Sequence, residues 1–169
     1  DHNGSRGLGD VYKRQDYVLG ESFVPILMDT ISEYKDQIEL KIGDLVEQVW
    51  PDSPIEICFI DVCKTATLNR HVSKQFYPNL IPNESWLINQ DFFFDRLPWI
   101  KVTMGYLEEY FEWQGQIATS SIYKNIKEVP LEIANVDPYH EFELDECLKL
   151  HDKHPSQFLD RRYSFYMDL

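Results

Sequence analysis

The stretch that decides the fold begins with IEICFID at residues 55–61 and ends with SWLINQD at residues 85–91. Each run is short, rich in Ile, Phe and Trp, and finishes in an acidic residue, Asp61 or Asp91. The chain between them has helical spacing and closes on the turn sequence FYPNLIPN at residues 76–83. A strand, a crossover helix and a second strand of this kind predict a parallel βαβ unit with both strands buried.

The two acidic residues fall at the predicted functional edge of this unit. Open parallel sheets bind their ligands outside the carboxyl ends of the strands, which is where Asp61 and Asp91 lie. An alternative is that each aspartate only caps a helix, because loops before helices favour Asp. Lys64 is either a salt-bridge partner of Asp61 or a contact for the carboxylate of a bound ligand, and the sequence leaves both open.

The chain before this unit carries three weaker patterns. Residues 21–34 have the apolar spacing of a helix, with Pro25 in its first turn. Residues 38–42 alternate like a short strand that stops at Gly43-Asp44, a pair that is also typical of an ordinary turn. Residues 45–50 fit a brief helix that Pro51 ends.

After Asp91 the patterns predict two helices and a strand pair. Pro98 opens a helix whose apolar stripe keeps the 3.6 period to Phe111. Residues 116–123 and 125–129 are predicted to pair as terminal strands, and residues 143–151 to form an appended helix. In the central unit, Thr65 is the predicted cap of the crossover helix.

Composition limits the classes of function. The chain has 169 residues, of which 43% are hydrophobic, enough for one domain with a core. The formal net charge of −13 argues against nucleic acid as a partner, because phosphate binding needs a basic footprint. No apolar run reaches the roughly 20 residues of a membrane span, and no signal-peptide core is visible. We therefore expect a cytoplasmic protein that binds neither membrane nor nucleic acid.

The three cysteines, Cys58, Cys63 and Cys147, form no C-x-x-C pair, so we expect reduced thiols and no zinc site.

Residues 5–15, SRGLGDVYKRQ, resemble the in-frame translation of a transposase sequencing adapter. We therefore expect residues 1–15 to be non-native and the natural gene to continue upstream. The glycines of this stretch then carry no evidence for a nucleotide-binding loop.

The order of these elements resembles a known family. A strand leading to Gly43-Asp44, a strand ending at Asp61, the turn at residues 76–83 and a strand running into Gln90-Asp91 resemble the second half of class I S-adenosylmethionine-dependent methyltransferases. The likeness is greatest to the macrocin O-methyltransferase group and covers roughly residues 39–130. It implies an α/β, Rossmann-like sheet, mostly parallel with an antiparallel terminal strand and incomplete at the N-terminal side.

The resemblance also implies a domain division and a set of site residues. Residues 16–135 would be the C-terminal part of the methyltransferase domain, and residues 136–169 a helical appendage. Gly43 and Asp44 would bind the adenine of S-adenosylmethionine, and Asp61 its methionine end. Asp61, Gln90 and Asp91 would hold a metal, with Mg²⁺ as the candidate ion, and Asp61 and Asp91 would be catalytic.

Two residues depart from the family pattern. Gln90 stands where the first acid of a metal-binding pair is expected, and Cys63 stands where some relatives carry a second acid that acts as a base. Methyl transfer to a hydroxyl needs an oriented donor and a base or metal at the acceptor, and Mg²⁺ needs oxygen ligands. These departures therefore weaken the expected metal and base functions.

The expected function is transfer of a methyl group to a hydroxyl of a sugar or small metabolite. Because the glycine-rich first loop of the family has no counterpart in residues 16–169, we expect this chain to bind the cofactor poorly and to be inactive alone. A homo-oligomer stays open. The alternatives are a non-catalytic interaction module on a methyltransferase scaffold, and another α/β small-molecule enzyme such as a nucleotide-sugar modifying enzyme.

Overall fold

The computed structural model describes residues 22–154, which belong to two units that divide between Ile42 and Gly43. The predictions for residues 1–15, and for the part of the proposed appendage from Pro155 onward, lie outside the described residues.

The described part of the first unit contains helix α2, Val24–Thr30, and a 3-10 turn η1, Ser32–Tyr34. Pro25 occupies the first turn of α2, as predicted, but the helix is shorter than its apolar pattern. The predicted strand at residues 38–42 is wrong, because these residues form no strand and Ile42 is exposed. A strand needs a neighbour to satisfy its main-chain groups, and residues 38–42 pair with none of the described strands.

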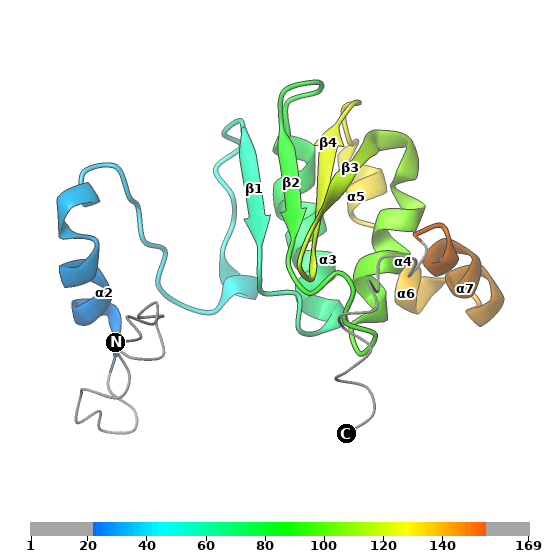
Figure 1. Cartoon of the computed structure of the whole chain (residues 1–169), viewed down its shortest axis with the longest axis horizontal. Coiled ribbons are helices and arrows are strands. Elements are labelled where there is room, and N and C mark those ends of the chain that lie inside the picture. The colour runs from blue at the N-terminus through cyan, green and yellow to red at the C-terminus, as the bar shows by residue number, and fades with distance from the viewer. Residues whose placement is uncertain (1–21, 155–169) are drawn as a thin grey trace, which may run out of the picture. The chain divides into compact units, whose positions relative to one another are not determined.

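The second unit is built on a four-stranded sheet of order β1-β2-β4-β3 (Figure 1). Its strands are β1 Ile57–Ile60, β2 Trp86–Asn89, β3 Phe111–Ile117 and β4 Ser120–Asn125. Strands β1 and β2 pair in parallel across helix α3, Ala66–Phe76, so the predicted βαβ unit is confirmed. Thr65 caps α3, since its side chain accepts a hydrogen bond from the Leu68 N–H at 3.2 Å.

The prediction of a mostly parallel sheet is wrong for the described strands, because two of the three pairings are antiparallel. The cause is the tight connection at Ala118 and Thr119, which turns the chain back so that β4 inserts between β2 and β3. Strand β3 runs in the same direction as β1 and β2, since each of β2 and β3 is antiparallel to β4. The chain is therefore α/β with an open, mixed sheet.

The hairpin also corrects two predicted boundaries. Helix α4 covers Pro98–Tyr106 and is followed by the 3-10 turn η4, Glu108–Tyr110, so the helix does not continue to Phe111. Phe111 begins β3 instead, and the two terminal strands start earlier than predicted. Tyr110 and Phe111 are buried at the sheet edge of the core, and an apolar run alone does not distinguish a continuing helix from the start of a strand.

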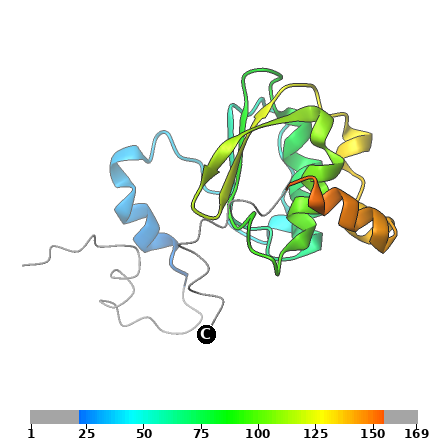
Figure 2. The ribbon, with the colours of Figure 1, turned by 45° about the vertical axis from the view of Figure 1, so that its right-hand side comes forward.

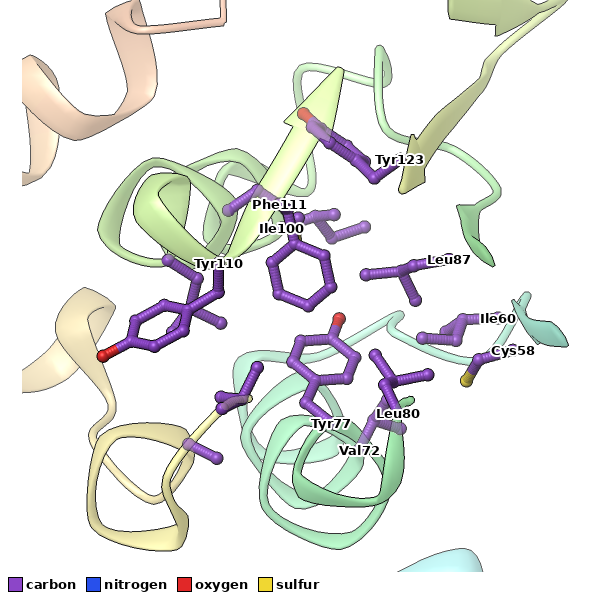
Figure 3. Close-up of a cluster of buried hydrophobic side chains, with 14 of the residues drawn as sticks. Cys58, Ile60, Val72, Tyr77, Leu80, Leu87, Ile100, Tyr110, Phe111 and Tyr123 are labelled. Atoms are coloured by element: carbon purple, nitrogen blue, oxygen red, sulfur yellow. The ribbon is translucent and has the colours of Figure 1, made fainter. Parts of the chain in front are cut away.

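Helices α3, α4 and α5, Leu131–Ala134, lie on one face of the sheet (Figures 1 and 2). Between them and the strands lies the main core, in which Tyr77 meets Phe111 edge to face at 5.6 Å and Leu87 is fully buried (Figure 3). Tyr77 belongs to the 3-10 turn η3, Tyr77–Asn79, that ends α3. A second turn, η2 Leu45–Glu47, packs against α3 from the N-terminal side of the unit.

The opposite face of the sheet, which we call the open face, carries two cross-strand rows of side chains. Strand register places Ile57, Trp86, Lys124 and Glu112 in one row, and Phe59, Ile88, Ile122 and Gly115 in the other. Ile57 is 67% exposed and Phe59 is 59% exposed. The prediction that both central strands are buried is therefore wrong, because the helices of the second unit described here cover the other face.

Helices α6, Pro138–Glu141, and α7, Leu144–Asp152, pack on α4. The appended helix predicted at residues 143–151 is confirmed. Gly105 of α4 allows the close approach, because a Cβ at this position would lie 2.1 Å from the Leu150 carbonyl oxygen. None of the described helices combines the length and the apolar character needed to cross a bilayer.

Replacing Gly105 by Ala tests this contact. In an exposed helix Gly→Ala stabilises by about 1 kcal/mol, whereas here the added methyl group pushes α7 away from α4. We expect a net loss of about 1–3 kcal/mol in the free energy of unfolding, measured by urea denaturation. Leu148→Ala, on the exposed side of α7, is the control and should change stability by less than about 0.5 kcal/mol. A Gly105→Ala protein as stable as the wild type would contradict the close packing.

Candidate functional site

Three of the predicted site residues, Asp61, Gln90 and Asp91, lie where β1 and β2 end, at the carboxyl edge of the sheet. The Gln90 N–H donates to the Ile60 carbonyl oxygen at 2.8 Å, which extends the parallel pairing beyond the two strands. Asp61 and Asp91 follow directly. The Lys64 ammonium donates to Asp61 Oδ1 at 2.8 Å and also to Asp91 Oδ2. We call Asp61, Lys64 and Asp91 the carboxyl-edge cluster.

The loop that carries Lys64 is fixed by the main chain and by α4. The Lys64 N–H donates to the Val62 carbonyl oxygen at 2.7 Å, and the Cys63 carbonyl oxygen accepts from Trp99 Nε1 at 2.8 Å. Thr65, the next residue, is the cap of α3. These contacts place the Lys64 backbone between Asp61 and the start of a helix, so its side chain reaches both carboxylates from one position.

Asp91 adopts a left-handed backbone conformation, with φ of 58°. Asp and Asn tolerate this conformation better than most residues other than Gly. The Asp91 carbonyl oxygen accepts from the Phe94 N–H at 2.9 Å, which closes a turn, while Phe92 is fully buried. Phe92 therefore anchors the loop in the core.

The charges of the cluster do not balance. Two carboxylates and one ammonium leave a formal charge of −1, and the Lys64 and Asp61 side chains are about half exposed. Asp91 is less exposed, at 27%. The hydrogen bond to Asp61, and then the one to Asp91, raise the pKa of Lys64 above its usual value, so the ammonium form persists at neutral pH.

The arrangement does not fit a bound magnesium ion. The predicted ligands were Asp61, Gln90 and Asp91, but the two carboxylates already share the ammonium of Lys64, which stands in the place of a cation. Across residues 22–154, no group of three or more His, Cys, Asp and Glu side chains is arranged to hold a metal. A metal at this edge would first have to displace Lys64 from both acids.

Gly43 and Asp44, the predicted adenine contacts, have a local structural function. Gly43 has φ of 136°, a conformation that favours glycine, and Asp44 Oδ1 accepts from the Val46 N–H at 3.1 Å to cap η2. Within the described part of the chain, no hydrogen bond or ion pair joins them to the carboxyl-edge cluster. Gly43 and Asp44 therefore form an ordinary turn, which was the alternative interpretation of this pair from the sequence.

Cys63 cannot replace the missing acid as a base. Burial raises its thiol pKa to about 12, with a smaller contribution from Cys58, and burial raises the pKa of Cys58 to about 12 as well. Both thiols are reduced in the structure, as predicted, and both are buried in the core. The charged side chains that hydrogen bonds join at the carboxyl edge are the three of the cluster.

Sequence reasoning missed the buried Lys101 of α4. Its side chain is 3% exposed, with its ammonium 3.8 Å from the Asp95 carboxylate and 5.6 Å from the centre of the Phe93 ring. One lysine in an apolar helix gives no signal that distinguishes it from a surface lysine. A shallow pocket of about 520 Å³ lies near the amino end of β1, away from both lysines, and is lined by Trp50, Pro54, Ile55, Glu56, Ile57 and Ile81.

Comparison of the chain with protein-family models, with curated protein sequences and with solved structures finds no match.

The raised thiol pKa values predict slow alkylation. A pKa of about 12 leaves roughly one thiol in 10⁴ as thiolate at pH 8, against about one in ten for an ordinary cysteine. In a Cys147→Ser background, we expect Cys58 and Cys63 to react with Ellman's reagent at least about 100-fold more slowly in the native protein than after denaturation. The native rate should increase with pH up to the pKa. If native protein rapidly released one thionitrobenzoate per cysteine from Ellman's reagent, the result would contradict the burial of these thiols.

Proposed function

We propose that this chain is part of an S-adenosylmethionine-dependent methyltransferase that acts on a hydroxyl group of a sugar or small metabolite. The observation that carries the proposal is the carboxyl-edge cluster, in which two acids from adjacent parallel strands meet one ammonium. Ligands of open α/β sheets bind at this edge, and two oxygen bases with a cation between them suit proton removal from a weak nucleophile.

The strand directions also support the proposal. The resemblance implies a set of parallel strands followed by an antiparallel terminal strand, and β1, β2 and β3 run one way while β4 runs the other. Helix α3 crosses between β1 and β2, as a parallel pair requires. A fold alone does not establish an activity, so the cluster remains the main argument.

The cluster has the charges that the cofactor and acceptor need. Bound S-adenosylmethionine supplies an electrophilic methyl group on a positively charged sulfur. The net formal charge of −1 on the cluster attracts such a cation. The cofactor would supply a methyl group whose bond to sulfur breaks as the acceptor oxygen takes it, with the neutral thioether leaving. Asp61 or Asp91 would accept the proton of the acceptor hydroxyl, and Lys64 would hold both carboxylates in position.

We expect this chain to bind S-adenosylmethionine weakly, because Gly43 and Asp44, the expected adenine contacts, are engaged in a local turn. Nuclear magnetic resonance detects such binding residue by residue. On titration with S-adenosylmethionine, the amide signals of residues 61–65 and 90–92 should shift. Asp61→Asn and Asp91→Asn should each weaken the binding at least about tenfold, through loss of a charge contact.

The matched control is Asp36→Asn, which removes the same charge from an exposed residue of the first unit. Asn keeps the left-handed conformation at position 91, so a loss of binding by Asp91→Asn reports the charge. Shifts confined to residues outside the carboxyl edge, or equal binding by all three variants, would contradict the proposed site.

A second candidate function is a non-catalytic assembly module that pairs two copies of this chain. The open face favours it, because Ile57, Phe59 and Trp86 expose apolar surface side by side on paired strands. Lys124 and Glu112 are opposite in charge and lie in the same row, so two such faces in antiparallel contact offer complementary charges. Contiguous exposed apolar surface of this kind is typical of an interface.

Sedimentation equilibrium tests this second candidate. If the open face pairs two copies, the wild-type chain should form a concentration-dependent dimer. Phe59→Lys should weaken the dimer at least about tenfold, since it places a charge within the contact. Leu144→Lys, at an exposed position on α7, is the control and should leave the dimer unchanged. A wild-type chain that stays monomeric at the highest soluble concentration would exclude the module as a homodimer.

A further inference from the structure

We propose that Lys64 is a built-in counter-cation, which holds Asp61 and Asp91 together and excludes divalent metal ions from the carboxyl edge. The inference concerns the charges of the cluster and stands whether or not the site transfers methyl groups. It reverses the metal dependence that the sequence motifs imply.

The two carboxylates need a cation because they approach one another. Asp61 and Asp91 come from neighbouring strands, and one nitrogen atom hydrogen-bonds to both. Two like charges within reach of a single ammonium repel each other, and this repulsion disfavours the doubly charged state unless a positive charge lies between them. In the structure Lys64, which is 27 residues before Asp91 in the sequence, supplies that charge.

Lys64 contacts the same oxygens that a metal would need. A magnesium ion takes oxygen ligands in octahedral geometry, usually from one or two carboxylates. Asp61 Oδ1 and Asp91 Oδ2 are the acceptors of the ammonium. A metal can bind between these carboxylates only after both ion pairs break.

Lys64 also differs from a dissolved ion because its ammonium is attached to the main chain beside the two acids. Its main chain is held by the hydrogen bond to Val62 and by the cap at Thr65, and the Trp99 bond to Cys63 fixes the residue before it. A cation attached to the site competes at a high effective concentration, whereas a free ion must be drawn from solution. Lys64 therefore outcompetes dissolved divalent ions at the edge.

Removing the ammonium should create a metal site. Lys64→Met keeps an unbranched side chain of similar length but leaves the two carboxylates without their shared ammonium. Because the Lys64 side chain is 49% exposed, we expect the substitution to leave the fold intact, which a thermal melt by circular dichroism checks.

Manganese is the probe, since bound Mn²⁺ broadens nearby amide signals and so reports where it binds. The localisation matters because a chain with a net charge of −13 also attracts cations elsewhere. Wild-type protein should show no selective broadening at residues 60–65 and 90–92. Lys64→Met should show it, with at least about tenfold tighter binding at this edge.

Two further variants complete the test. Lys64→Met combined with Asp91→Asn should lose the broadening, because one of the two acids is gone. Lys74→Met, which removes an exposed lysine of α3, should behave as the wild type. Selective Mn²⁺ binding by the wild type that equals that of Lys64→Met would overturn the inference. So would the absence of any gain in a Lys64→Met protein whose melt shows it folded.

The outcome is separable from that of the proposed function. If S-adenosylmethionine shifts no signal at the carboxyl edge while Lys64→Met gains Mn²⁺ there, the methyltransferase proposal fails and the counter-cation stands. If the cofactor binds at the edge and wild-type protein also binds Mn²⁺ there as tightly as the variant, the counter-cation fails alone.

Discussion

The parallel pairing of β1 with β2 is the constraint on which the rest of the structure depends. At the amino end, the buried Ser85 hydroxyl donates to the Ile55 carbonyl oxygen and accepts from the Ile81 N–H, so one side chain joins the turn to both strands. At the carboxyl end, Gln90 continues the ladder to Ile60. Because the register is fixed at both ends, the acids that follow each strand must emerge side by side.

The carboxylates of Asp61 and Asp91 lie close enough to share one ammonium, so their negative charges repel each other. The ammonium of Lys64, which is part of the same chain, pairs with both carboxylates and offsets this repulsion. The same arrangement leaves one net negative charge, which suits a cationic ligand. In the two proposals, Lys64 excludes divalent ions and the remaining carboxylate charge attracts a sulfonium, so the proposed methyl transfer does not need the acid that Gln90 replaces.

The sheet is asymmetric in a way that affects both candidate functions. Its helix-covered face contains the core around Tyr77 and Leu87, and its open face presents Ile57 and Phe59. Apolar surface of this kind gains free energy when another surface covers it, at about 25 cal/mol per Å² of apolar area. An enzyme would use the carboxyl edge, whereas an assembly module would use the open face, and the two surfaces are separable by mutation.

Local signals in the sequence were enough to predict the βαβ unit, the Thr65 cap, the helices with Pro25 and Pro98 in their first turns, and the reduced state of the cysteines. The sequence also placed Asp61 and Asp91 at one edge, because strand periodicity and chain order suffice for that. Three features came from the folded structure alone: β4 inserts antiparallel beside β2, one sheet face is open, and Lys64 bridges both acids. These features depend on contacts between residues far apart in the chain, and neither helical nor strand periodicity records which distant partner a side chain will meet.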